Sequence, residues 1–153
     1  MTSQTDPTLR EHYCFGCGRH NPIGFHLVFE REDDGGVVAR YTPRMEDQGF
    51  PDAMHGGLLA LLLDEAMGWA MYADGVFAVT AKMELRYRRT AGLDGALTAR
   101  ARILRSRGRR IEVEAALTDD DGQVLVQASA LFMRMSAEDE ARALASFQAS
   151  AGG

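Results

Sequence analysis

The longest hydrophobic stretch of the chain runs from Leu58 to Met71, and its apolar residues fall on every face of a helix. A helix that is apolar all round is typical of a protein interior rather than a surface. A membrane span is not expected, because Asp64 and Glu65 interrupt the stretch and acids near a membrane centre are very costly. We therefore predict a helix over residues 55–73, enclosed by the rest of the protein, with a carboxylate pair inside and Gly75 just past its end.

Beyond this helix the hydrophobic positions change to a period of two, which is the period of a β-strand. The alternation from Phe77 to Arg88 predicts one long, half-buried strand. Other segments predict further strands over residues 25–31, 37–42, 96–106, 110–117 and 124–135, with turns rich in Gly and Asp between several of them. Ser136 is expected to cap a short helix over residues 137–147, and the last residues are expected to fray.

An antiparallel sheet with one apolar face must cover that face. The helix at 55–73 is the only predicted element that is apolar enough and long enough to do so. The fold class is therefore predicted as α+β, with a curved antiparallel sheet wrapped around one central helix. We expect a loose N-terminus over residues 1–12, a single domain over 13–135, and a short C-terminal helix and tail over 136–153.

Composition narrows the functional classes. The 153 residues are 46% hydrophobic and 25% charged, which suits one soluble globular domain. A net charge of −5 argues against a nucleic-acid partner, because proteins that bind nucleic acids usually carry a basic face. The polar N-terminus lacks the apolar core of a signal peptide and only two cysteines are present, so a cytoplasmic location away from membranes is expected.

The two cysteines, Cys14 and Cys17, raise the question of a metal site, since His12, His20 and His26 lie nearby in the sequence. No second cysteine pair is present to complete a structural zinc site. The two cysteines are also too close together in the chain to staple the fold through a disulfide. A compact turn is therefore favoured here, and no metal or other cofactor is expected.

Several motifs agree in spacing, helix character and strand order. His55-Gly56-Gly57 opens the helix, Asp64 follows seven positions after Gly57, the helix continues as LLDEAMGWA, and MELRYRRT closes the next strand. Together with CFGCGRHNPIGFHL, these motifs make residues 13–135 resemble the hotdog-fold superfamily, and within it acyl-CoA thioesterases of the phenylacetate-pathway and 4-hydroxybenzoyl-CoA type. The resemblance implies an acyl-CoA substrate and a homodimer whose two sheets join, with active sites at the subunit interface. A homotetramer built from two such dimers is the alternative.

The resemblance also assigns roles to residues of the site. The catalytic carboxylate falls on Asp64, and the backbone N–H that stabilises the oxyanion falls on Gly56. The Asn or Gln that is typical just upstream of His-Gly-Gly falls on Gln48, and a Ser or Thr of the following strand falls on Thr80. Whether Asp64 attacks the thioester directly or activates water stays open.

The chemistry of a helix start leads to the same site. The first N–H groups of a helix are unpaired and carry partial positive charge, and glycines at 56 and 57 let a substrate approach them. Gly57 and Asp64 share one helix face but lie about 10 Å apart along the axis, too far to serve one thioester carbon together. We therefore predict that antiparallel helices bring Gly56 of one chain to Asp64 of the other. Arg88 and Arg89 are candidates for binding the CoA phosphates.

Some roles keep two interpretations. His55 either acts as a base or, as favoured here, holds the loop by hydrogen bonds. Glu65 faces about 100° away from Asp64 and is expected to hydrogen-bond a loop or a dimer partner instead of acting as the base. The alternative functions are a non-catalytic acyl-CoA sensor and a hotdog hydratase or dehydratase. The stretch GRHNPIGFH lacks the acid that hydratases of this fold carry, which counts against hydration.

Overall fold

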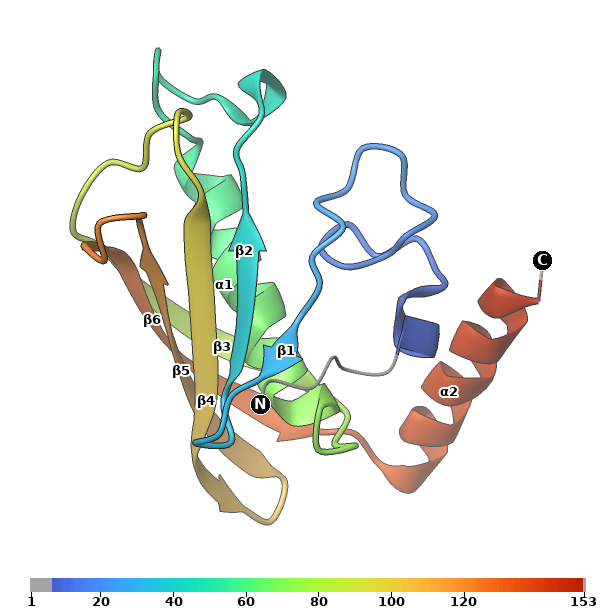
Figure 1. Cartoon of the computed structure of the whole chain (residues 1–153). Helices are drawn as coiled ribbons and strands as arrows, with labels where there is room; N and C mark the ends of the chain where they lie inside the picture. Colours follow the sequence, from blue (N-terminus) through green and yellow to red (C-terminus); the bar gives the residue numbers. More distant parts are fainter. Residues whose placement is uncertain (1–6, 153) are drawn as a thin grey trace.

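One antiparallel sheet curves around helix α1 (Gly56–Tyr72) in the computed structural model, which describes residues 7–152 and only the backbone of residues 7 and 8 (Figure 1). The strands are β1 (Glu30–Arg31), β2 (Val37–Tyr41), β3 (Ala78–Tyr87), β4 (Leu97–Arg107), β5 (Arg110–Thr118) and β6 (Val124–Arg134). The other helical elements are the 3₁₀-helices η1 (Pro7–Arg10) and η2 (Met45–Asp47) and the C-terminal helix α2 (Ala137–Ala151). This is the predicted α+β hotdog architecture, with the sheet wrapped around one long helix.

The strands lie in the order β1-β2-β4-β5-β6-β3, and every pair is antiparallel. Strand β3 pairs only with β6 and therefore forms one edge of the sheet. Of the alternating apolar positions predicted for this strand, Phe77 is buried and Met83 and Leu85 are half-buried, whereas Val79 and Tyr87 are each 52% exposed. The expected burial is therefore wrong for part of the strand in a single chain.

Helix α1 is held by the core along most of its length. Leu62, Leu63 and Met67 are fully buried, and Trp69 is nearly so. The prediction that the helix is enclosed on all sides is wrong for its first half, where Gly57 is exposed and Leu61 and Asp64 are only half-buried. These positions recur at helical spacing and so form one open stripe.

The N-terminal segment lies beside α1 on the side away from the sheet, and α2 lies beyond that segment (Figure 1). The Phe29 ring stacks on Trp69 with centroids 5.6 Å apart, and Phe77 lies 6.5 Å from Phe147 of α2. The predicted strand at 25–31 is wrong for residues 25–29, because their backbone pairs with the cysteine loop instead of a strand. The N–H groups of Phe25 and Leu27 donate to the carbonyls of Phe15 (2.8 Å) and Gly16 (2.9 Å).

Both ends of the described chain are more regular than the sequence suggested. The Ser136 hydroxyl accepts the Asp139 N–H (3.1 Å) and caps α2, which continues to Ala151 instead of fraying after 147. At the other end, residues 7–10 form η1 and His12 is buried, while residues 1–6 of the predicted loose segment lie outside the described residues. Across residues 7–152, no helix combines the length and hydropathy that a membrane crossing requires.

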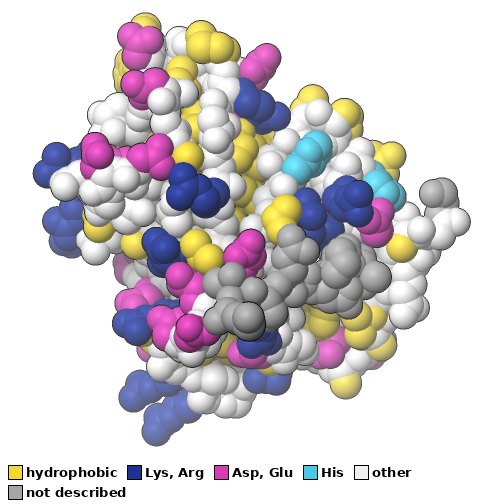
Figure 2. Space-filling model, in the orientation of Figure 1, with side chains coloured by type: hydrophobic (Ala, Val, Ile, Leu, Met, Phe, Trp, Pro, Cys, Tyr) yellow, Lys and Arg dark blue, Asp and Glu magenta, His cyan; other side chains and the backbone are white. Residues whose placement is uncertain are grey.

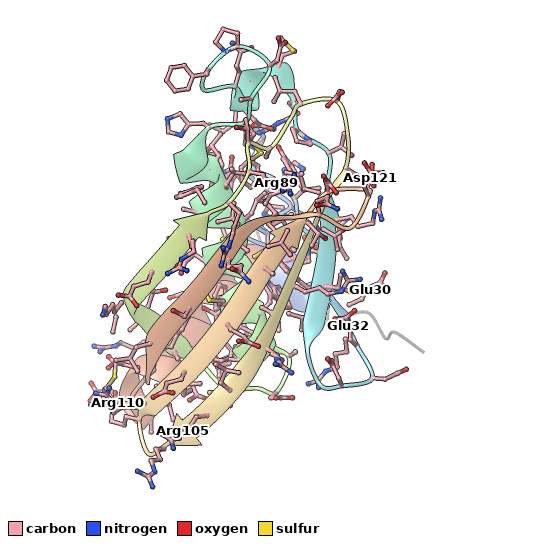
Figure 3. The ribbon with its side chains drawn as sticks, turned by 90° about the vertical axis from the view of Figure 1, so that its left-hand side faces the viewer. Glu30, Glu32, Arg89, Arg105, Arg110 and Asp121 are labelled. Carbon is pink, nitrogen blue, oxygen red and sulfur yellow. The ribbon has the colours of Figure 1, made fainter. Side chains whose placement is uncertain are left out.

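Charged side chains of both signs are interspersed on the face seen in Figure 2. The outer face of the sheet carries charged side chains along its length, with Arg105 and Arg110 at one end and Arg89 and Asp121 at the other (Figure 3). Arginines are thus present at both ends of the sheet. Only one of these ends borders the start of α1.

Candidate active site

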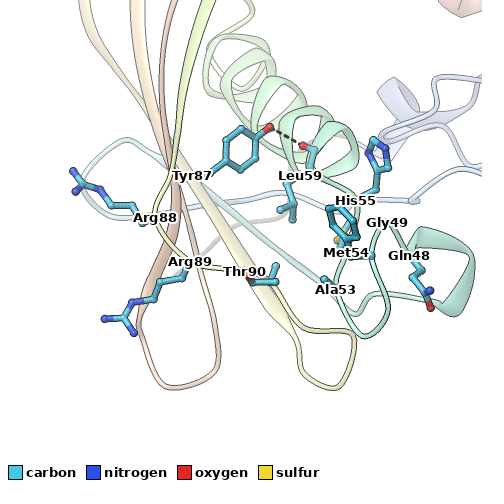
Figure 4. A pocket seen from close by; sticks show the side chains of 13 residues that line it. Gln48, Gly49, Ala53, Met54, His55, Leu59, Tyr87, Arg88, Arg89 and Thr90 are labelled. Atoms are coloured by element: carbon cyan, nitrogen blue, oxygen red, sulfur yellow. Dashed lines mark hydrogen bonds between the residues drawn. The ribbon is translucent and has the colours of Figure 1, made fainter.

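A cleft of about 710 Å³ lies where the loop before α1 faces the end of β3 (Figure 4). Isolated β-bridges between Gln48 and Met54 and between Ala53 and Gly92 hold the loop in place. The predicted site residues that line this cleft are Gln48, His55, Gly56, Arg88 and Arg89. The structure therefore brings five residues together that are up to 41 positions apart in the sequence.

The start of α1 presents one free amide to this cleft. His55 is the N-cap, and its Nδ1 accepts the Gly57 N–H at 2.9 Å. The Tyr87 hydroxyl donates to the Gly56 carbonyl at 2.7 Å (Figure 4). Among the described residues the Gly56 N–H has no acceptor, as expected at the first position of a helix. Of these two N–H groups, that of Gly56 is therefore the one without an acceptor among the described residues.

Asp64 and Thr80 form a second group, away from the cleft lining. The Thr80 hydroxyl donates to Asp64 Oδ1 at 2.7 Å, joining the open stripe of α1 to β3. A register shift between Thr80 and Lys82 interrupts the β3–β6 ladder beside this contact. The expectation that Asp64 lies in a dry interior is wrong for a single chain, because the described residues leave its side chain only half-buried.

Arginines form the β3 side of the cleft. The side chains of Arg88 and Arg89 extend away from the helix start (Figure 4). Arg88 Nε donates to Gln127 Oε1 at 2.8 Å, which fixes its direction and leaves its terminal nitrogens for another acceptor. Gly57, which was predicted to contact substrate, does not line the cleft.

The sequence interpretation missed several residues of the cleft lining, among them Tyr87 and Phe50. Tyr87 has the largest consequence, because its hydroxyl ties the end of β3 to the helix start. Tyr87 is the last apolar position of the alternating strand, and this position in the sequence could have indicated that it lies near the site. Phe50 is 84% exposed, which is unusual for a large apolar side chain and marks the cleft rim.

Glu65 lies on the other side of α1, beneath the cysteine loop. Cys14 Sγ lies 3.7 Å from Glu65 Oε1 and 3.6 Å from Oε2, and Trp69 Nε1–H donates to Oε1 at 3.2 Å. Burial, together with the charge of Cys14, raises the pKa of Glu65 to about 7. The expectation that Glu65 hydrogen-bonds a loop is confirmed.

The two cysteines of this loop differ in acidity. A hydrogen bond from Cys17, supported by the N–H groups of Gly16 and Cys17, lowers the pKa of Cys14. The same hydrogen bond and burial raise the pKa of Cys17. The histidines considered beside them have other partners. His12 Nε2–H donates to the Leu9 carbonyl, and His20 pairs with Glu11.

The third of these histidines, His26, donates its Nε2–H to the Asn21 carbonyl.

Comparison with known proteins shows to which family this architecture belongs. A solved thioesterase superfamily protein is 31% identical to this chain, and the alignment covers 86% of this chain and 69% of that one, with a TM-score of 0.76. The chain belongs to the thioesterase superfamily. The pattern of the Thioesterase superfamily matches residues 52–126, from the loop before α1 into β6.

Other matching proteins are less similar to this chain. The acyl-coenzyme A thioesterase THEM4 of Rattus norvegicus is 24% identical over 115 residues, which are 74% of this chain and 50% of that protein. The chain thus spans about half the length of the curated relatives it matches. A hypothetical thioesterase of Streptococcus pneumoniae, solved with coenzyme A, shares the fold at 21% identity and a TM-score of 0.67, over 71% of this chain and 87% of that one.

Proposed function

We propose that this thioesterase superfamily member hydrolyses an acyl-CoA thioester to a free acid and CoA, and that residues 13–135 form the catalytic domain. The observation that carries the proposal is the unpaired Gly56 N–H at the cleft, followed on the same helix by the Asp64 carboxylate. Relatives named acyl-coenzyme A thioesterase and a related fold solved with coenzyme A support this choice of substrate class.

The Gly56 N–H supplies the oxyanion site. When water adds to a thioester carbon, negative charge develops on the carbonyl oxygen, and a fixed N–H donor stabilises that charge. The Gly56 N–H lies at the positive end of α1 and has no internal acceptor among the described residues. The cap between His55 Nδ1 and Gly57 N–H holds the helix start rigid, so His55 is a positioning residue here.

Asp64 supplies the base. The Thr80 hydroxyl occupies Asp64 Oδ1 and orients the carboxylate. The carboxylate takes a proton from water as the water oxygen bonds to the thioester carbon, and the C–S bond then breaks to release CoA, whose sulfur takes up the proton. Direct attack by the carboxylate on the thioester carbon is the alternative route, and it would leave an acyl-enzyme anhydride for water to open.

The two groups must come from different chains. Gly56 and Asp64 are eight residues apart on one helix, which is about 12 Å along the axis. One reacting carbon needs both within roughly 3 Å. A second copy that pairs along the exposed β3 edge would cover the open stripe of α1 and place its Asp64 at the first copy's cleft. An unpaired ten-residue edge strand is also a liability that soluble proteins normally cover.

Arg88 and Arg89 bind the CoA phosphates in this proposal. They stand on the outer rim of the cleft, where the charged end of CoA would lie while its thioester reaches Gly56. Guanidinium groups suit phosphate because two N–H groups can donate to two oxygens at once.

The test is a panel of acyl-CoAs with release of free thiol as the readout, comparing the parent protein with Asp64→Asn. Thiol release by the parent and its loss in the variant, with CoA-ester binding retained, is the expected result. Binding without thiol release by the parent would favour the sensor. Consumption of an enoyl-CoA without thiol release would favour the hydratase.

A mixing experiment tests the shared site. Gly56→Pro removes the free N–H at the first helical position, where proline is tolerated. Neither Asp64→Asn nor Gly56→Pro is expected to be active alone. Unfolding and refolding the two together should restore about a quarter of parental activity, because half of the dimers are mixed and each holds one intact site. Lack of recovery, with mixed dimers shown by mass, would mean that one chain holds the whole site.

A further inference from the structure

Another face of α1, about 100° around the helix from Asp64, borders a second cluster of reactive groups that the proposed hydrolysis does not use. Cys14 Sγ, Cys17 Sγ and a Glu65 carboxylate oxygen all lie within 4.8 Å of one another. Both cysteines are free thiols, and Cys17 is buried. The cluster is assembled from two segments 51 residues apart, so a local turn alone does not account for it.

We propose that Cys14, Cys17 and Glu65 bind one Zn²⁺ ion that clamps the N-terminal segment onto α1. This revises the expectation that the two cysteines form only a compact turn. The missing ligand was Glu65, which the sequence places far from the cysteines. The inference is independent of the proposed hydrolysis, because it concerns other residues on another face of the helix.

The spacing of the donor atoms fits tetrahedral zinc. Zinc lies about 2.3 Å from a thiolate sulfur and about 2.0–2.2 Å from a carboxylate oxygen, so a sulfur and an oxygen of one site are about 3.5 Å apart. The distances from Cys14 Sγ to the two oxygens of Glu65 are 3.6 and 3.7 Å. The ligands therefore need little rearrangement to take up the ion. Two thiolates and one carboxylate suit zinc rather than magnesium or calcium, which prefer oxygen ligands alone.

Neighbouring groups already orient the carboxylate. Trp69 Nε1–H donates to Oε1 and leaves Oε2, the oxygen nearer to Cys14, for the metal. Hydrogen bonds of this kind from outside the ligand set are typical of built metal sites. At Gly16, a Cβ atom would lie 2.5–2.6 Å from the Glu65 side chain, so only glycine lets the loop approach the carboxylate this closely.

The loop geometry positions both sulfurs. The Gly18 N–H donates to the Cys14 carbonyl at 2.9 Å and closes the turn, and a Cβ at Gly18 would lie 2.4 Å from backbone atoms. Arg10 Nε–H donates to the Cys17 carbonyl at 3.2 Å and places a positive charge beside the site. This charge offsets part of the excess negative charge of two thiolates and a carboxylate around one divalent ion.

A fourth coordination position is available. A cavity of about 100 Å³ adjoins the three ligands and is otherwise lined by His12 and by apolar and aromatic side chains, namely those of Leu9, Trp69, Tyr72, Phe77 and Phe147. This volume holds a water molecule, which needs only about 10–15 Å³ of such space. Three protein ligands and one water is the arrangement of catalytic zinc sites, whereas structural zinc sites usually have four protein ligands, so a water would be the fourth ligand here. Helix α2 contributes Phe147 to the cover of the cavity, while the three ligands come from the cysteine loop and α1.

The experiment uses the full chain purified with a reducing agent and without chelator. Metal analysis should find one zinc ion per chain, or one after zinc is added to chelator-treated protein. Cobalt in place of zinc should show a thiolate-to-metal charge-transfer band and the visible bands of tetrahedral cobalt. Zinc should also raise the unfolding temperature of the chelator-treated protein, because it binds the folded state.

Three variants sharpen the result. Cys17→Ser and Glu65→Gln should each weaken zinc binding by more than the roughly 10- to 100-fold loss typical of changes outside the ligand set. Tyr72→Phe is the matched control, because it lines the same cavity, offers no ligand and should keep the cobalt spectrum. Circular dichroism on each variant separates lost binding from lost folding.

Three outcomes would overturn the proposal. One is reduced, folded parent protein that takes up no stoichiometric zinc or cobalt at micromolar concentration. Another is a charge-transfer band that survives in Glu65→Gln, which would reduce the site to adventitious binding by two cysteines. The last is a Cys14–Cys17 disulfide in protein kept under reducing conditions, which would make the pair a redox couple instead of a ligand set.

Discussion

Asp64 and Glu65 are neighbours in the chain, and α1 turns them to opposite environments. Asp64 lies on the open stripe beside the sheet edge and receives a hydrogen bond from Thr80. Glu65 lies under the cysteine loop, where burial and the charge of Cys14 raise its pKa to about 7. A rotation of about 100° per residue thus separates the carboxylate that we propose as the base from the one that contacts the cysteine loop.

A third carboxylate shows that burial alone does not decide the outcome. Asp47 is buried, and burial opposes its ionisation, yet the hydrogen bonds from Arg44 and Tyr41 outweigh this and lower its pKa. The number and charge of the donors around a buried carboxylate therefore determine its charge state. Glu65 receives hydrogen bonds from the Cys17 and Trp69 side chains, which are neutral donors, and burial together with the charge of Cys14 outweighs them and raises its pKa.

The sharpest test of the comparison is Asp64→Asn beside Glu65→Gln. Loss of a general base typically lowers kcat by roughly 10²- to 10⁴-fold, and this loss is expected for Asp64→Asn. Its unfolding free energy should stay within about 0.5 kcal/mol of the parent, because the side chain is half-buried and keeps its shape. Thiol-release kinetics and urea unfolding measure both quantities. An equal loss of kcat in Glu65→Gln would erase the distinction between the two carboxylates.

The helix start should respond almost as strongly. Gly56→Pro deletes the free N–H and is expected to lower kcat by roughly 10²- to 10³-fold. His55 has φ −61° and ψ 131°, an extended conformation that a following proline favours, so the fold should survive. Gly56→Ala keeps the N–H and adds a Cβ 3.6 Å from the Tyr87 ring, an ordinary contact, so it serves as the control. Equal losses in both variants would mean that space at the cleft, not the donor, limits the rate.

On the Glu65 side, Gly16→Ala should destabilise the fold without acting on the cleft. Its Cβ would overlap the Glu65 side chain, and overpacking of this kind costs about 1–3 kcal/mol. Urea unfolding of chelator-treated protein measures this loss. Gly95→Ala, whose Cβ would lie 3.4 Å from Asp120, is the matched glycine change and should have a smaller effect. A stable Gly16→Ala variant would show that the loop does not press on Glu65 in solution.

At the cleft rim, the pair Arg88→Gln and Arg89→Gln should raise KM for acyl-CoA about fivefold, since exposed ion pairs contribute up to about 1 kcal/mol. KM for an acyl thioester of N-acetylcysteamine, which lacks the phosphates, should not change. Arg105→Gln, at the far end of the sheet (Figure 3), is the control. A rise in KM for both thioesters would indicate a shape effect instead of phosphate binding.

The smallest expected effect concerns Asp47 and pH. Its pKa is lowered on folding, so the ionised carboxylate contributes stability above its unfolded pKa of about 3.9, and this contribution is lost as pH falls through the folded value. The difference in unfolding free energy between the parent and Asp47→Asn should therefore be largest near pH 6 and shrink below about pH 4. A difference that is constant over this range would show that Asp47 does not titrate with folding.

The elements themselves follow from the local pattern of residues. The period of 3.6 around α1 and the period of two in the strands after it predicted those elements to within one or two residues. These elements depend on which faces of a helix or strand are apolar, and that information is carried by neighbouring residues. The site residues were expected mainly from the resemblance to a known family, and in a single chain they lie in two groups, with Thr80 against Asp64 and with Gln48, His55, Gly56, Arg88 and Arg89 around the cleft.

Tertiary structure alone decided the rest. The sheet places β3 beside β6 and leaves its outer edge unpaired, and no local pattern distinguishes this from pairing with β4. Glu65 meets Cys14 across 51 residues because the N-terminal segment packs on α1, and Tyr87 reaches Gly56 because β3 ends beside the helix start. Hydrophobic periodicity reports which side of an element is covered, whereas the identity of the covering group depends on how distant segments pack together.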